Sequence, residues 1–468
     1  MRGNMDIIRI IARKIENRMT ASQMMASGFA LVIFLGGILL CLPCSNADGR
    51  WFNPIDGLFT SCSAVCVTGL VTIVPAAQFT MVGKVILLLL IQFGGLGIIA
   101  CTMGAFLILR RQITIRNRVV IQESYNLNTM SGLVVMLIYV LKGTFLVEGI
   151  GALLYSFQFV PEYGFLRGIW YSIFHAVSAF CNAGIDILGD TSLQAYQSNP
   201  CINFVTIGLI VVSGLGFTVW QDLVRMLKRI SKREATVGRS IQKLRLQTKI
   251  VLSVTSVLIL VGAVFFFCIE KGNPDTLGGM PLWEKWMASL FQSVTTRTAG
   301  FFTIPQGAFR EESKLLSCFL MFIGGSPGGT AGGVKTTTVA ILLLTCWSVL
   351  KGNTDTECFR RKIPATNVRT ALSVIIVAFL ALITGTLAIL LFEPIGLMDA
   401  LYEVTSAVGT VGLSVGITPV LSDASKAVVI LLMYMGRIGP VTLALLFAGK
   451  VGKKKNGRSL PEERVMVG

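Results

Sequence analysis

The chain has 468 residues, of which 53% are hydrophobic and only 14% charged, and its mean hydropathy is +0.73. This balance is typical of a polytopic membrane protein and excludes a soluble protein with a large core. Lys and Arg exceed Asp and Glu by 17, but they cluster between apolar stretches, so membrane topology explains them before nucleic-acid binding does. The single histidine, His175, excludes a histidine-rich metal site.

The chain begins with a basic segment, residues 1–20, that we expect to lie as an amphipathic helix on the cytoplasmic membrane surface. Apolar stretches then recur, each long enough to cross a hydrocarbon core of about 30 Å. They cover residues 24–44, 80–109, 131–156, 201–228, 247–269, 314–350, 367–392 and 424–449. The prediction is therefore an all-α polytopic protein with eight transmembrane helices.

Four shorter semi-apolar segments lie between these stretches and resemble one another. Each has an aromatic residue, a Ser or Thr four residues later, and a terminal glycine. They are residues 59–69, 174–184, 291–300 and 402–412, and their terminal glycines are 115, 116 and 112 residues apart. A second glycine cluster follows each segment, at 94–97, 214–216, 324–333 and 436–439. This pattern predicts four tandem repeats of helix, re-entrant pore helix and helix.

The positions of the charges predict the orientation of these repeats. Basic clusters lie at 1–20, 110–118, 225–249, 351–369 and 450–458, all of them at repeat boundaries. The boundaries and both termini are therefore expected in the cytoplasm, with the re-entrant segments entering from outside. The predicted domains are an N-terminal segment 1–20, repeat 1 (21–118), repeat 2 (119–245), repeat 3 (246–362), repeat 4 (363–450) and a cytoplasmic tail, 451–468.

Four equivalent re-entrant segments around a pseudo-fourfold axis would bring four short extended strands together, with their carbonyls pointing inward. Rings of carbonyl oxygens can replace the hydration shell of a potassium ion. Glycine suits the last position of each strand because it adopts backbone dihedrals closed to other residues. This arrangement predicts a central pore that binds K⁺. The expected ion-binding residues are Val67, Thr68, Gly69, Asn182, Ala183, Gly184, Thr298, Ala299, Gly300, Thr410, Val411 and Gly412.

The glycine cluster inside the apolar stretch 314–350 is the most unusual of the four. Six glycines and a proline lie in the ten residues from Gly324 to Gly333. Such a composition breaks a helix, and broken backbone at membrane depth must be buried in protein or line a water-filled cavity. A flexible loop between helices is an alternative. A phosphate-binding loop is another, but its pattern requires glycine at position 334, where Val334 stands.

The sequence resembles the Trk/Ktr/HKT superfamily of potassium transporters. The resemblance rests on motifs in all four repeats: F-H-A-V-S-A-F-C-N-A-G at 174–184, Q-S-V-T-T-R-T-A-G-F at 292–301, I-G-G-S-P-G-G-T-A-G-G-V-K-T-T-T at 323–338 and M-G-R-I-G-P at 435–440. Only one predicted membrane helix precedes the first filter segment, whereas Trk-type subunits usually carry two more. The chain therefore looks most similar to the membrane subunit of a bacterial Ktr system.

The resemblance implies gated potassium translocation across the bacterial cytoplasmic (inner) membrane. It implies a homodimer in which each protomer has its own pore, seated on a cytoplasmic ring of nucleotide-binding RCK subunits, so that a nucleotide would bind only the partner. All four filter glycines are present, and in some plant relatives the first is Ser, a change associated with Na⁺ transport. Na⁺-dependent K⁺ uptake, or weakly selective Na⁺/K⁺ translocation, remains the alternative. A polytopic membrane enzyme is disfavoured because no polar catalytic constellation is visible.

By the same resemblance, residues 323–335 form an intramembrane loop below the filter, and we expect this loop to be the gate. Arg437, in the last predicted span, has two interpretations: a structural ion pair or carbonyl brace, and an electrostatic barrier that contacts the loop. Glu403 and Glu148 are its candidate partners. The expected gate residues are Gly324, Gly325, Ser326, Pro327, Gly328, Gly329, Thr330, Gly332, Gly333, Lys335 and Arg437.

Other polar residues receive less specific predictions. Asp56, Asp186 and Asp399 either concentrate cations at the pore mouth or are simply solvated. His175 and Arg297 are expected to brace pore helices rather than touch ions. The basic stretch 225–249 would dock an RCK ring, or would only signal topology with some contact to anionic lipid. The tail 460–468 is a candidate contact with the second protomer.

Overall fold

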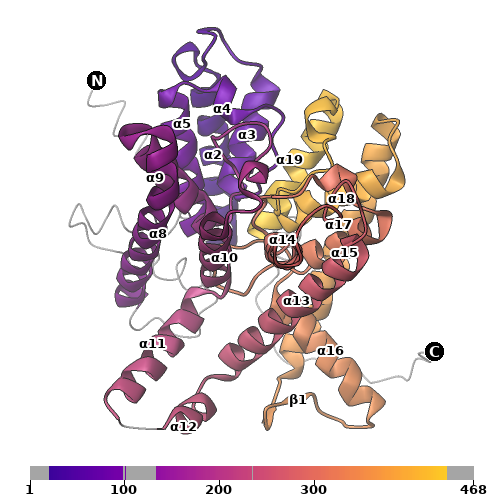
Figure 1. Cartoon of the computed structure of the whole chain (residues 1–468). Helices are drawn as coiled ribbons and strands as arrows, with labels where there is room; N and C mark the ends of the chain where they lie inside the picture. Colours follow the sequence, from indigo (N-terminus) through magenta and orange to yellow (C-terminus); the bar gives the residue numbers. More distant parts are fainter. Residues whose placement is uncertain (1–20, 98–100, 102–132, 234–235, 440–468) are drawn as a thin grey trace, which may run out of the picture.

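The computed structural model describes residues 21–97, 101, 133–233 and 236–439, which form a mostly helical bundle (Figure 1). The predicted amphipathic segment 1–20, the tail 451–468 and the basic clusters 110–118 and 450–458 lie outside the described residues. We divide the described chain into four quarters, each of which begins with a long apolar helix.

The first two quarters occupy the indigo and magenta part of Figure 1. Quarter 1 contains α2 (Ala21–Cys41), η1 (Pro43–Ser45), α3 (Pro54–Cys66), α4 (Pro75–Gln78) and α5 (Met81–Leu96). Quarter 2 contains α8 (Leu133–Tyr163), α9 (Phe165–Cys181), η2 (Gln194–Tyr196), α10 (Pro200–Gly214), α11 (Phe217–Ser231) and α12 (Val237–Gln242).

The last two quarters follow the same order of helices. Quarter 3 contains α13 (Leu246–Glu270), α14 (Leu282–Thr295), η3 (Gln306–Ala308), α15 (Glu311–Phe322), α16 (Thr336–Leu350) and the antiparallel strands β1 (Glu357–Cys358) and β2 (Arg361–Lys362). Quarter 4 contains α17 (Ala365–Phe392), α18 (Leu397–Gly409), η4 (Thr418–Val420) and α19 (Asp423–Ile438).

The first helix of each quarter is long and apolar enough to cross a membrane. Among the described residues, α2, α8, α13 and α17 meet that criterion by length and composition. The reason lies in their sequence: each has at least 18 consecutive residues with few charges, about the length that spans a hydrocarbon core. These four helices coincide with four of the eight spans predicted from the sequence.

The second apolar helix of each quarter is interrupted at its glycine cluster. Helix α5 ends just before Gly97, α10 and α11 meet at a bend of 100° next to Gly216, and α19 ends just before Gly439. These three glycines have φ of 85°, 90° and 97°, a region that side chains disfavour, so the helix cannot continue through them. The break predicted between 314 and 350 is present, and the span predicted over 201–228 consists of two helices, α10 and α11, bent by 100°.

The quarters pack against one another in a closed circle. Within each quarter the long helix packs on a short one, as α2 does on α3 and α8 on α9. Between quarters, the second apolar helix contacts the short helix of the next: α5 with α9, α10 with α14, α15 with α18, and finally α19 with α3. Figure 1 shows the yellow α19 beside the indigo α3, where this circle closes. The four short helices are therefore surrounded by long ones.

Candidate functional site

The four short helices α3, α9, α14 and α18 are followed by the same unusual backbone conformation. The residues Val67, Asn182, Thr298 and Thr410 have φ between 50° and 68°, in the left-handed region. Two residues later stand Gly69, Gly184, Gly300 and Gly412, with φ of 104°, 64°, 84° and 95°. A left-handed valine or threonine is rare and strained, so its recurrence at equivalent positions means that the surrounding fold imposes it. The expectation of fully extended strands is therefore wrong at the first residue of each.

A hydroxyl near the end of each short helix braces the segment that follows. Ser63 Oγ accepts a hydrogen bond from the Gly69 N–H, and Ser406 Oγ accepts one from the Gly412 N–H, both at 3.0 Å. In the other two quarters the hydroxyl donates instead, to the carbonyl of the residue after the glycine. These bonds run from Ser178 to Ile185 (2.6 Å) and from Thr295 to Phe301 (2.5 Å). The Ser/Thr of each motif was visible in the sequence, but its bracing role was not predicted.

The four segments meet in a circle that we call the glycine ring, comprising the twelve residues 67–69, 182–184, 298–300 and 410–412, all of them buried. A Cβ added at Gly69 would lie 2.6 Å from the carbonyl oxygen of Ala183, and one at Gly300 would lie 2.6 Å from that of Val411. Likewise Gly184 faces Ala299 O at 2.5 Å, and Gly412 faces Thr68 O. Each glycine thus faces a carbonyl of the next quarter, and no larger residue fits.

Residues 323–335, which we call the glycine-rich loop, separate α15 from α16 and are tied together at their ends. The Gly324 N–H donates to Val334 O (2.8 Å), and the Thr336 N–H donates to Gly325 O (3.0 Å). Lys335 Nζ donates to the carbonyls of Ala331 (2.6 Å) and Gly332 (3.3 Å) within the same loop. Lys335 therefore braces the loop, and its charge is satisfied by backbone dipoles.

The glycine-rich loop contacts the glycine ring directly. Asn182 Nδ2 donates to Thr330 Oγ1 at 3.3 Å. A Cβ added at Gly332 would collide with the Thr410 side chain, and one at Gly333 would lie 3.1 Å from Gly409 O. The loop therefore lies against the second and fourth segments of the ring.

Arg437, near the end of α19 in quarter 4, joins the glycine-rich loop of quarter 3 to the end of α5 in quarter 1. Its Nη1 donates to Thr330 O in the loop, and its Nη2 donates to Gly94 O and Gly95 O (3.3 Å for the latter) at the end of α5. These bonds to backbone carbonyls fit the brace interpretation drawn from the sequence, and the contact with the loop is also what the barrier interpretation expects. This brace also contacts the loop, so Arg437 links quarters 1, 3 and 4 through backbone oxygens.

The two carboxylates offered as partners for Arg437 have hydrogen bonds elsewhere. Glu403 accepts from Thr418 and from Ser414 (2.8 Å for the latter), which fixes the segment after the fourth ring segment. Glu148, in α8, accepts from Gln92 Nε2 at 3.1 and 3.3 Å. Both side chains are buried.

Two of the acids expected at the pore mouth are in ion pairs between quarters. Asp56 accepts from Lys426 (2.8 Å), and Asp399 accepts from Lys314 (3.0 Å). The side chains of Asp56 and Lys426 are only 13% and 10% exposed. These pairs fasten the start of a short helix to the second helix of the preceding quarter, so these two acids are paired with lysines rather than simply solvated. Asp186 accepts from two backbone N–H groups of its own loop, at 3.1 and 3.4 Å.

The surroundings of His175 and Arg297 agree with the expected bracing role. His175 Nδ1 lies 2.7 Å from Tyr171 O, and its ring packs among aromatic rings that include Phe159 (centroids 5.4 Å apart). Arg297 is 5% exposed, and its Nη2 donates to Thr255 Oγ1 on α13 at 3.4 Å. Both side chains hold short helices in place within their own quarters.

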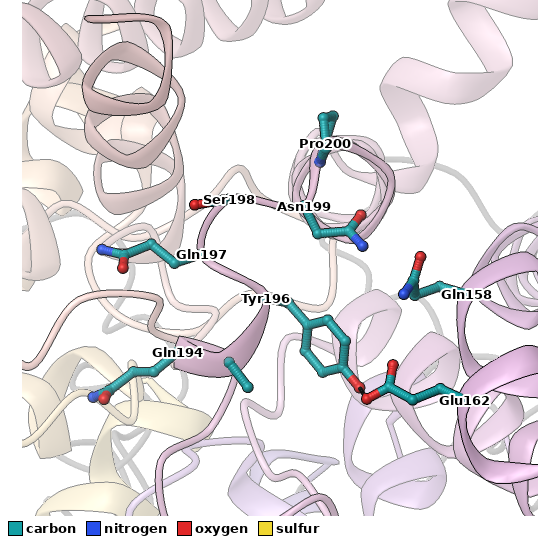
Figure 2. Close-up of a pocket in the computed structure, with 9 residues that line it drawn as sticks. Gln158, Glu162, Gln194, Tyr196, Gln197, Ser198, Asn199 and Pro200 are labelled. Carbon is teal, nitrogen blue, oxygen red and sulfur yellow. Dashed lines mark hydrogen bonds between the residues drawn. The ribbon is translucent and has the colours of Figure 1, made fainter. Parts of the chain in front are cut away.

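A separate pocket of about 690 Å³ lies between the end of α8 and η2 (Figure 2). Figure 2 shows Tyr196 pointing at Glu162, to which its hydroxyl donates at 2.8 Å. None of the nine residues that line the pocket belongs to the glycine ring. The hydrogen bond ties η2 to α8.

Across the part of the chain that the structure describes, no group of three or more His, Cys, Asp and Glu could hold a metal ion.

These features define a class of protein: a multi-pass helical membrane protein that gathers backbone carbonyls where its four quarters meet. The chain matches the family model TrkH, described as a cation transport protein, over residues 10–458. It belongs to this family of transporters, which confirms the resemblance drawn from its motifs.

Named relatives cover nearly the whole chain. It is 39% identical over 463 residues to the potassium/sodium uptake protein NtpJ of Enterococcus hirae, a match that spans 98% of this chain and all of the relative. It is 36% identical over 431 residues to the Ktr system potassium uptake protein B of Bacillus subtilis, covering 92% of this chain and 94% of the relative. The relatives are named as transporters, in agreement with the prediction that the chain is not an enzyme.

The fold is similar to that of a solved structure, the potassium transporter TrkH from Vibrio parahaemolyticus. The match has a TM-score of 0.69 at 20% sequence identity and covers 90% of this chain and 84% of that chain. At this identity the likeness supports the fold alone, that of a helical membrane transporter.

Proposed function

We propose that the chain carries potassium ions across the bacterial cytoplasmic membrane through the glycine ring, which acts as its selectivity filter. The observation that carries this proposal is the closed circle of contacts in which each glycine faces a carbonyl oxygen of the next quarter. Carbonyls of Thr68, Ala183, Ala299 and Val411 would replace water around a dehydrated ion. The hydroxyl braces of the short helices hold these carbonyls in register.

In this proposal the four quarters are four repeats, with the boundaries given above, and α3, α9, α14 and α18 are their pore helices. Each pore helix ends at the glycine ring, so its C-terminal partial negative charge is directed toward the ion. The basic clusters at repeat boundaries favour cytoplasmic termini and a ring that is reached from outside.

The glycine-rich loop is the gate of the proposed pore. It lies against two ring segments, and Arg437 and Lys335 hold it there by donating to its carbonyls. Opening would require the bond between Arg437 and Thr330 to break while the ring itself keeps its hydroxyl braces. Because the loop is rich in glycine, its backbone has low barriers to such rearrangement.

We further propose a homodimer regulated by a cytoplasmic ring of RCK-type subunits that bind the nucleotide. Support comes from relatives in Bacillus subtilis and Vibrio alginolyticus that are named as protein B of a Ktr system. A name of this kind implies that the system contains at least one further protein. The second half of α11 and the whole of α12 lie within the basic stretch 225–249 and offer exposed cationic side chains for that contact.

A second candidate is weakly selective or Na⁺-dependent potassium uptake by the same pore. The observation that favours it is the printed name of the relative NtpJ, a potassium/sodium uptake protein, at 39% identity. The four glycines of the ring are common to both candidates, so only transport measurements separate them.

The test is uptake of radioactive rubidium and sodium into proteoliposomes that contain this chain, beside a Gly69→Ser variant. Rubidium uptake that the variant loses, or shifts toward sodium, supports a selectivity filter at the glycine ring. Equal uptake of both ions by both proteins contradicts it. Deletion of residues 326–332 tests the gate separately: we expect higher flux, and unchanged flux in a folded deletion variant would refute the gate.

A further inference from the structure

The break between α10 and α11 lies directly against the glycine-rich loop. The Ser326 N–H donates to Gly214 O (3.0 Å), and the Phe217 N–H donates to Gly328 O (2.9 Å). The two hydrogen bonds run in opposite directions, one from the loop to the break and one from the break to the loop. Two interrupted helices, from quarters 2 and 3, therefore satisfy each other's free backbone groups.

This contact is made by backbone against backbone. A Cβ added at Gly216 would lie 2.6 Å from Pro327 O, and Gly216 has a φ of 90°. From the loop side, a Cβ at Gly329 would lie 2.8 Å from Ser213 O. No side chain separates the two segments, so there is no flexible group to absorb a shift. Movement of the loop must break these bonds or carry the start of α11 with it.

Helix α11 is also held by hydrogen bonds other than those to the loop. The Trp220 indole Nε1 donates across the bend to Val212 O (2.7 Å). Asp222 accepts from the Arg245 N–H (2.9 Å) and from Thr248 Oγ1 (2.8 Å), so it ties α11 to the start of α13. Figure 1 shows α11 leaving α10 toward the end of the molecule that carries α12. The helix is thus a stiff arm with one end on the loop.

We propose that residues 214–217 form a second latch on the glycine-rich loop, distinct from Arg437, and that α11 is the arm through which the loop is moved. This inference rests on the proposed role of the loop as a gate. The outer part of α11 carries Arg225, Lys228 and Arg229, all of them exposed, where a partner can act on the arm. Because coupling between two sites is reciprocal, release of the loop must also loosen α11.

The first experiment compares Gly216→Ala with Gly208→Ala in the full chain in proteoliposomes. The methyl group at position 216 meets the loop and is strained at positive φ, whereas nothing lies within 4 Å of a Cβ at position 208, inside α10 and outside the proposed latch. We expect rubidium flux about tenfold higher in Gly216→Ala, the effect of weakening two backbone hydrogen bonds, and within about twofold of wild type in Gly208→Ala. Gly329→Ala approaches the same contact from the loop and should act like Gly216→Ala.

The second experiment measures the reciprocal effect with a spin label at Lys228→Cys, in a chain whose native cysteines, of which Cys44, Cys268 and Cys346 are exposed, are replaced by serine. The Arg437→Ala substitution should increase the mobility of this label, and a label at Arg369→Cys on α17 should not change. Unchanged mobility at position 228 in a flux-active Arg437→Ala protein would overturn the coupling. So would wild-type flux in folded Gly216→Ala and Gly329→Ala proteins. If Arg437→Ala and the loop deletion also leave flux unchanged, the gate itself is refuted; if they raise it, only the second latch fails.

Discussion

Replacing Arg437 by Ala removes the side chain that joins the glycine-rich loop to α5. The bond to Thr330 O is the one that holds the loop, and a hydrogen bond from a charged donor contributes about 1.5–3 kcal/mol. Since about 1.4 kcal/mol is a factor of ten, its loss should shift the equilibrium toward the open loop by about 10- to 150-fold. Rubidium uptake into proteoliposomes measures this shift, and it should rise until the open state dominates.

The matched control is Arg437→Lys, which separates a brace from an electrostatic barrier. Lysine keeps the charge but is a point donor that cannot reproduce the fork of Arg437, which reaches Thr330 and Gly94 at once. A brace predicts raised flux in both variants; a barrier predicts wild-type flux in the lysine variant. Thermal unfolding in detergent shows whether each variant is folded. Wild-type flux in a folded Arg437→Ala protein would refute the latch.

Three further outcomes follow from the packing of the quarters. Asp56→Asn leaves the buried Lys426 without its carboxylate and should lower the free energy of unfolding by about 3 kcal/mol, measured by denaturation in detergent. Ser406→Ala leaves a buried N–H of the ring unpaired, at a cost of about 1–3 kcal/mol, and should reduce the rubidium-to-sodium uptake ratio severalfold. Gly300→Ala places a methyl group 2.6 Å from a carbonyl oxygen and should abolish uptake, whereas Gly149→Ala, which meets nothing within 4 Å, should not.

Each of these three predictions would be refuted by a specific result. An Asp56→Asn protein as stable as wild type would mean that Lys426 finds another partner or stays hydrated. An unchanged ion ratio in Ser406→Ala would show that the hydroxyl does not control the position of the ring carbonyls. Uptake by Gly300→Ala at the wild-type rate would mean that ions do not pass through the glycine ring.

The sequence was sufficient to predict the four short helices, because their motif recurs at a nearly constant interval and each copy ends in glycine. The left-handed conformation of Val67 was not predictable, since valine disfavours it and only the surrounding fold imposes it. The break at Gly216 was missed for a similar reason. A helix tolerates an isolated glycine at about 1 kcal/mol, so the decisive factor is the contact with Pro327, which lies in another quarter.

Charge pairing was beyond sequence reasoning for a different reason. Asp56 and Lys426 are 370 residues apart, and they meet only because the last helix returns to the first quarter. The residues next to Asp56 in the sequence do not indicate that it contacts Lys426. By contrast, the hydrogen bonds of Lys335 are local, because its partners lie only three and four residues away.

The ion pair between Asp56 and Lys426 also constrains the order in which the protein can be assembled. The carboxylate is synthesised early, while its lysine is 370 residues away toward the other end of the chain. Until α19 is inserted beside α3, the first short helix has an acidic residue without its partner and lacks the last side of its enclosure. In a nascent chain Asp56 must therefore remain hydrated or protonated until α19 arrives, and a chain truncated before residue 426 lacks the lysine that pairs with it.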